Sequence, residues 1–135
     1  MTNAEITCRS LYRQCVLARD RFCQIFGCET SLYNLAPHHL FHRSQGNWHL
    51  LFDIDFGVTL CPYHHVPFAH ERREEFWDKI IPVIRCKDEA RAVKILKQKN
   101  SLNKVPNLRP DYKLIKGILR KQLKDIQEKA WMNAF

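Results

Sequence analysis

Long apolar runs, repeats and low-complexity tracts are missing from this chain of 135 residues. No stretch approaches the roughly 18 uncharged apolar residues that a membrane-spanning helix needs, and residues 1–5 lack the basic-then-apolar layout of a secretory signal. With 45% apolar and 27% charged residues, the composition excludes disordered and collagen-like chains. We therefore expect a cytoplasmic protein without a membrane partner, built as one compact domain or as one core with a helical appendage.

Net charge is absent from the first half of the chain and concentrated in the second. Residues 1–70 hold five basic and five acidic residues, which leaves 17 basic and 9 acidic residues for 71–135. The whole net charge of +8 therefore lies in the C-terminal half. That half is the candidate surface for a polyanion.

The N-terminal half shows helical and then strand-like patterns. A helix is predicted over residues 3–19, because Thr2 and Glu5 have the spacing of a capping box and apolar residues then recur every three or four positions. Cys8 and Cys15 lie on that apolar stripe, where a thiol packs as a small hydrophobe, so neither is a candidate ligand. Residues 35–42 and 56–60 are predicted to form the short strands of a hairpin with a long loop.

Helical patterns follow from residue 62 onward. Pro67 and Pro82 should kink or restart the helices that carry them, and Asp88 is a predicted N-cap for a helix over about 89–99. Pro110 suits the first turn of a last helix. The apolar stripe of that helix is Tyr112, Ile115, Leu119, Leu123, Ile126 and Ala130.

Two pairs of candidate metal ligands lie on separate turns. Cys23 and Cys28 have four residues between them on a turn that contains Gly27, and Cys61 and His64 follow the second predicted strand with two residues between them. Such pairs can close a tetrahedron around Zn²⁺, whose binding contributes free energy of folding. The pattern predicts a structural zinc site, and unrelated buried cysteines are the alternative.

All seven histidines lie between residues 38 and 70, which suggests a second metal site. The neighbours His38 and His39 should point to opposite faces of a strand, so one can bind a metal while the other takes a proton from water. His65 and His70 are the remaining candidate ligands of an imidazole-rich site. For any one of these histidines, the alternative is a solvated or hydrogen-bonded side chain.

Taken together, the order of these motifs resembles the zinc-containing branch of the HNH endonucleases. The motifs that carry the resemblance are, in chain order, Arg19-Asp20, Cys23-x4-Cys28, His38-His39 and Leu60-Cys61-x2-His64-His65. The resemblance covers roughly residues 9–70 and implies an α+β fold with a treble-clef-like ββα-metal core, a zinc knuckle and helical extensions at both ends. We expect an HNH-like domain with an N-terminal helix over 1–85 and a basic helical extension over 86–135.

The resemblance also implies a role for each matching residue. His38 matches the metal ligand of the first strand, His39 the general base that activates water, and His65 the ligand of the helix that follows. The knuckle ligands match Cys23, Cys28, Cys61 and His64, the last standing where a cysteine is more usual.

Two positions depart from the family pattern. The central asparagine, which orients the general base, would fall at Phe56, so Asp55 or backbone groups must do the orienting. The last histidine of the family usually comes four residues after the helix ligand, whereas this chain has Ala69 there and His70 one residue later. His70 is therefore the candidate third ligand of the catalytic ion.

The implied activity is metal-dependent hydrolysis of DNA phosphodiester bonds, with one catalytic Mg²⁺, Mn²⁺, Ni²⁺ or Zn²⁺ beside the structural zinc. Arg43 is a candidate DNA contact near the hairpin loop, and the basic face of the last helix adds Lys116, Arg120 and Lys124. Two other classes stay open: a nucleic-acid-binding module with weak or no cleavage, and an assembly protein that forms a homodimer through its C-terminal helices. The small size would suit a phage or mobile-element protein.

Overall fold

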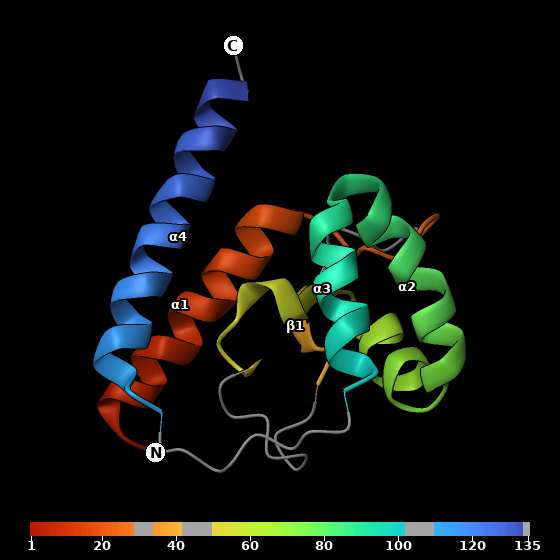
Figure 1. The fold of residues 1–135 in the computed structure, drawn as a ribbon, viewed down its shortest axis with the longest axis horizontal. Helices are drawn as coiled ribbons and strands as arrows, with labels where there is room; N and C mark the ends of the chain where they lie inside the picture. Colours follow the sequence, from red (N-terminus) through yellow and green to blue (C-terminus); the bar gives the residue numbers. More distant parts are fainter. Residues whose placement is uncertain (29–33, 42–49, 102–109, 134–135) are drawn as a thin grey trace.

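The computed structural model describes residues 1–28, 34–41, 50–101 and 110–133. Helices dominate it, and two short strands form its sheet, which agrees with the predicted α+β class (Figure 1). The elements are α1 (Asn3–Asp20), β1 (Ala36–His39), the 3₁₀ turn η3 (Ile54–Phe56), β2 (Gly57–Leu60), the π-helix η4 (His64–His70), α2 (Arg73–Lys87), α3 (Glu89–Lys99) and α4 (Tyr112–Asn133). None of the described helices is both long and apolar enough to cross a membrane.

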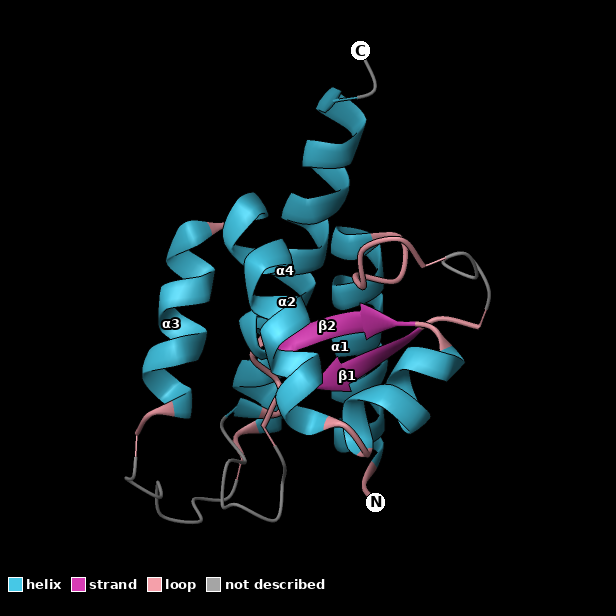
Figure 2. Cartoon of the chain, turned by 90° about the vertical axis from the view of Figure 1, so that its right-hand side faces the viewer, coloured by secondary structure: helices cyan, strands magenta, loops and turns pink. Residues whose placement is uncertain are grey.

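The two strands form the expected antiparallel hairpin but are shorter than predicted (Figure 2). In the ladder, His38 pairs with Val58 and His39 with Gly57. Phe56 falls in η3 instead of β2, because the Asp53 carboxylate accepts a hydrogen bond from the Asp55 amide at 3.0 Å and caps a turn there. The sheet thus begins at Gly57, directly after that turn.

The first helix begins where the sequence predicts and packs along α4. The Thr2 hydroxyl accepts a hydrogen bond from the Glu5 amide at 3.2 Å, which confirms the predicted cap. Cys8 and Cys15 are fully buried, and the Cys15 thiol donates to the Leu119 carbonyl at 3.4 Å. Their predicted role in packing is confirmed, since α1 and α4 lie side by side (Figure 1).

The last helix begins at Tyr112, two residues after Pro110. The Asp111 carboxylate accepts a hydrogen bond from the Leu114 amide at 3.1 Å, so Asp111 is the cap and Pro110 precedes it. The prediction that Pro110 lies in the first turn is therefore wrong. The predicted stripe does face α1: Leu119 is fully buried, and Tyr112, Ile115, Leu123 and Ile126 pack around it.

On the opposite side of the hairpin from α1 and α4, α2 and α3 form a second helical layer (Figure 1). Asp88 caps α3 by accepting from the Arg91 amide at 3.0 Å, as predicted. At Pro82 the helix does not restart, because α2 runs through this residue, and Ile80 and Ile84 on either side of it are buried in the core. The alternative, a kink at Pro82, stays a prediction. Pro67 does interrupt α-helical geometry, since it lies inside η4.

Two apolar cores stabilise the chain. One lies between the knuckle, the hairpin, α2 and α3, and the other between α1, η3 and α4. Ala92 and Ile95 of α3 are fully buried in the first core, although α3 belongs to the second of the two predicted domains. The boundary at residue 85 stays a prediction.

Candidate metal centres

Four potential ligands meet where the knuckle contacts the end of β2. The group comprises Cys23, Cys28, Cys61 and His64, and its ligand atoms all lie within 4.8 Å of one another. The Nδ1 atom of His64 is 3.4 Å from Cys23 Sγ and 3.3 Å from Cys61 Sγ, and the Sγ atoms of Cys28 and Cys61 are 3.6 Å apart. A tetrahedral ion with metal–sulfur bonds of about 2.3 Å separates its ligand atoms by about 3.5–3.8 Å. The four side chains can therefore hold one metal ion.

Local backbone geometry explains how the chain brings these ligands together. Gly27 has a φ of +80°, a conformation that favours glycine, and it turns the chain between Cys23 and Cys28. The backbone amide of Gln24 donates to the Thr59 carbonyl at 3.0 Å, and this bond joins the knuckle to β2. The Cys61 carbonyl accepts from the His65 amide at 2.9 Å and starts the turn that presents His64.

Burial sets the protonation of this group. It raises the pKa of the Cys23 thiol well above its ordinary value and lowers the pKa of His64, with Lys79 contributing to the second shift. A neutral imidazole is the form that binds a metal, whereas a thiol must lose its proton to do so. Metal binding at the knuckle should therefore release protons.

Three histidines form a second group of potential ligands. The ligand atoms of His38, His65 and His70 lie within 4.8 Å of one another, and the ring centroids are 5.1–5.2 Å apart in each pair. His38 is 6% exposed and packs edge-on against Phe76, while His70 lies at the surface. Burial and the nearby His70 lower the pKa of His65, which favours its neutral, metal-binding form.

The π-helix η4 explains why His70 joins this group. Residues five apart lie about 140° apart around an α-helix and so face different sides. In a π-helix the backbone bonds run between residues five apart, which brings such residues to the same side. His65 and His70 are both inside η4, together with Pro67. His65 and His70 are one residue further apart than the two histidines of the family pattern. The wider turn of the π-helix compensates for this extra residue.

His39 lies in different surroundings from its neighbour. Its ring stacks on Tyr12 of α1, with centroids 4.9 Å apart and planes inclined by 10°. It also lines a cavity of about 210 Å³ together with Arg9 and Arg13. His38 and His39 therefore contact different parts of the fold, as the alternation of side chains along a strand predicts.

Phe56, at the expected asparagine position, and its neighbour Asp55 both contact residues other than His39. Phe56 is buried in the core, edge-on to Phe41 with ring centroids 5.2 Å apart. The Asp55 carboxylate pairs with Lys94 at 2.9 Å near the surface. An orienting role for the Asp55 carboxylate stays a prediction, and Lys94 is its described partner.

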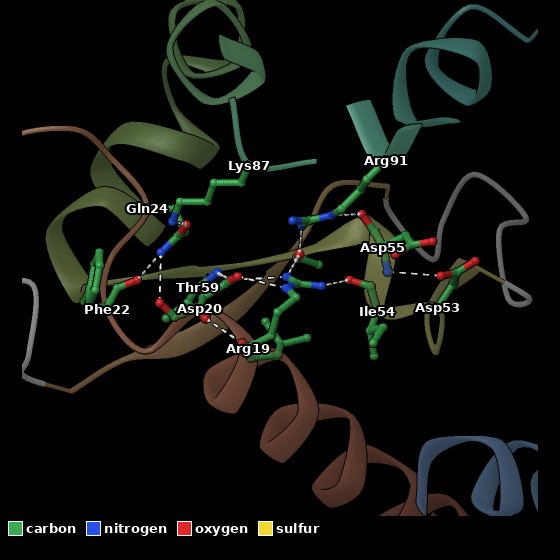
Figure 3. Close-up of polar contacts among 12 residues, drawn as sticks. Arg19, Asp20, Phe22, Gln24, Asp53, Ile54, Asp55, Thr59, Lys87 and Arg91 are labelled. Carbon is green, nitrogen blue, oxygen red and sulfur yellow. Dashed lines mark hydrogen bonds and ion pairs between the residues drawn. The ribbon is translucent and has the colours of Figure 1, made fainter. Parts of the chain in front are cut away.

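Sequence reasoning missed a buried polar network behind the hairpin (Figure 3). Arg19 donates to the carbonyls of Ile54 and Gly57, and Arg91 donates to the carbonyls of Asp55 and Gly57. Arg19 belongs to a motif that carries the family resemblance, whereas Arg91 lies outside it. A basic residue on a charged helix is usually solvated, so the sequence around Arg91 carries no signal of burial.

The predicted DNA contacts are only partly within the described residues. Arg43 lies outside them. On α4, Arg120 and Lys124 are exposed and Lys116 is half-buried. The ammonium group of Lys124 is 3.9 Å from the Glu128 carboxylate, an exposed pair that contributes little to stability.

Comparison of the chain with protein-family models, curated proteins and solved structures finds no match. A functional assignment therefore depends on the two ligand groups, the surroundings of His39 and the charge of the C-terminal helices.

Proposed function

We propose that the chain is a metal-dependent DNA endonuclease of the HNH type. Two ligand groups of different chemistry carry the proposal. A compact set of three cysteines and one histidine suits a structural zinc, because four protein ligands complete its tetrahedron. Three imidazoles, one of them at the surface, suit a catalytic ion that keeps a position for water or substrate.

The chemistry proposed for the second group is phosphodiester hydrolysis. His38, His65 and His70 would hold a divalent ion, and such an ion would supply Lewis-acid stabilisation of the charge that develops on the phosphate. His39 takes a proton from the attacking water as its oxygen bonds to phosphorus. The bond from phosphorus to the 3′ oxygen breaks, and this oxygen leaves with the electron pair and takes a proton from solvent, which gives a 3′-hydroxyl and a 5′-phosphate.

The cavity beside His39 supports an anionic substrate. Arg9 and Arg13 are four residues apart on α1 and line the cavity with His39. Both side chains are anchored: Arg9 binds the Glu5 carboxylate at 3.0 Å, and Arg13 Nη2 donates to the Leu35 carbonyl at 3.0 Å. A guanidinium group has five N–H donors, so each arginine keeps donors for a phosphate oxygen.

A second candidate function is a nucleic-acid-binding module that does not cleave. The engagement of Phe56 in the core and of Asp55 with Lys94 favours it, because neither side chain then replaces the asparagine of the family. In that case the two metal sites would stabilise the fold, and the basic C-terminal helices would bind DNA.

Digestion of supercoiled plasmid by purified protein separates the two candidates. The nuclease proposal expects nicked or linear DNA with at least one of Mg²⁺, Mn²⁺ and Ni²⁺, and no cleavage in EDTA. His38→Ala should weaken metal binding and cleavage together. DNA that is bound but never cleaved with any of these ions would instead support the binding module.

A further inference from the structure

Every backbone carbonyl from Ile54 to Gly57 accepts a hydrogen bond. Arg19 donates to Ile54 and, at 2.7 Å, to Gly57, and Arg91 donates to Asp55 at 2.9 Å and to Gly57 at 2.6 Å. The remaining carbonyl, that of Phe56, accepts from the Leu40 amide at 2.9 Å. Two guanidinium groups from α1 and α3 thus hold a segment of four residues (Figure 3).

The carbonyl oxygen of Gly57 accepts hydrogen bonds from two positively charged groups, the guanidinium groups of Arg19 and Arg91. Arg91 is 7% exposed, and burial together with the neighbouring Arg19 lowers its pKa to about 10. The Asp20 carboxylate offsets part of the repulsion by binding Arg19 Nε at 2.8 Å, while its other oxygen accepts from the Thr59 amide. Burying a guanidinium group costs free energy of folding unless its N–H groups have hydrogen-bond acceptors. The hydrogen bonds of Arg91 to the Asp55 and Gly57 carbonyls therefore offset the cost of its burial.

The held segment supports His39 from two directions. It pairs with β1, because Gly57 lies opposite His39 in the ladder and the Phe56 carbonyl binds the next amide, that of Leu40. It also contacts Tyr12, whose hydroxyl lies 2.1 Å from the position that a Cβ atom on Gly57 would occupy. The Tyr12 ring in turn stacks on His39.

We infer that Arg91, acting with Arg19, is a positioning residue for His39 and works through the backbone of residues 54–57. Phe56 stands where the resemblance expects an orienting asparagine, and the backbone on either side of it is fixed by the two guanidinium groups. The inference rests on the proposed function, because His39 is the proposed general base.

Arg91→Lys tests this inference, since lysine keeps the charge but lacks the planar fork that binds two carbonyls. The matched control is Arg85→Lys, because Arg85 is exposed and pairs with Glu89 on the surface. We expect Arg91→Lys to lower kcat for plasmid cleavage by about 10- to 100-fold with an unchanged KM, as for a misplaced catalytic group. Amide exchange at Leu40 should become about 10-fold faster while zinc content stays the same. The control should match the wild type.

An unchanged kcat, or a lower kcat with unchanged Leu40 exchange, would overturn the inference. If Arg91→Lys does not fold, Arg19→Lys tests the same carbonyl and should give the same pattern. Wild-type protein that cleaves no DNA would overturn the proposed function and the catalytic consequence of the contacts that Arg19 and Arg91 make with residues 54–57. Exchange at Leu40 then still decides whether Arg91 holds the segment: faster exchange supports it and equal exchange contradicts it.

Discussion

The imidazole of His39 lies almost parallel to the phenol ring of Tyr12, with 4.9 Å between the ring centroids. Tyr12 is buried on α1, and its hydroxyl has no hydrogen-bond partner among the described residues. A phenol in this position offers a flat surface to the imidazole and leaves a buried polar atom unsatisfied. The stacking on His39 therefore involves the ring of Tyr12 and not its hydroxyl.

Tyr12→Phe should leave cleavage unchanged and keep or raise stability, by up to about 1 kcal/mol, because an unsatisfied buried hydroxyl is removed. Tyr12→Leu should lower both, since the stacking surface is lost and a cavity forms, at a cost of about 2 kcal/mol or more. Chemical denaturation gives the stability of each variant. A Tyr12→Phe protein that is clearly less stable than the wild type would mean that the hydroxyl has a partner.

Two glycines give a matched test of packing around the same tyrosine. A Cβ on Gly57 would lie 2.1 Å from the Tyr12 hydroxyl and 3.1 Å from a methyl of Val16, whereas a Cβ on Gly117 meets nothing within 4 Å. Gly57→Ala should destabilise by about 1–3 kcal/mol through overpacking. Gly117→Ala, inside α4, should stabilise by about 0.8–1 kcal/mol through helix propensity. Equal stabilities of the two variants in urea would contradict the close approach of α1 to the hairpin.

The knuckle should retain about one zinc per chain after dialysis against a mild chelator. Cys23→Ser should lose that zinc and much of the cooperative unfolding transition, because the binding energy of a structural site is largely folding energy. Cys86→Ser is the control, since Cys86 is an exposed cysteine outside the ligand group. Elemental analysis and thermal unfolding measure both effects. Well-folded protein without zinc would refute the structural site.

Local signals in the sequence were enough to predict several elements. The caps at Thr2 and Asp88 depend on residues three positions away, and both were predicted correctly. The paired spacing of the knuckle was equally informative, because the ligands of one ion must meet in space. The caps depend on short-range geometry, which a sequence pattern records directly. Each ligand pair of the knuckle also has a short spacing, although the two pairs are more than 30 residues apart in the chain.

Features set by tertiary contacts could not be predicted in the same way. The residue spacing did not determine that His65 and His70 would share a π-helix, the conformation that lets His70 join His38. The burial of Arg91 depends on carbonyl groups 34 to 36 residues away along the chain. Helix periodicity carries no information about such distant partners.

The basic face of α4 should add affinity for DNA that does not depend on sequence. Replacing Lys116, Arg120 and Lys124 by Gln should flatten the plot of log K against log salt by about 0.9 for each phosphate contact that is lost. A charge-conserving control changes Lys116 and Lys124 to Arg and should keep the slope. Fluorescence anisotropy with duplexes of unrelated sequence measures both. An unchanged slope in the triple variant would identify α4 as a packing or dimerisation element.

The most direct test of the proposed nuclease is the cleavage rate of His39→Ala at full metal occupancy, with occupancy established by calorimetric titration. The proposal predicts a rate about 10²- to 10⁴-fold below that of the wild type with nearly unchanged metal affinity, because only the general base is lost. A His39→Ala protein that cleaves DNA at the wild-type rate would contradict this account of the site.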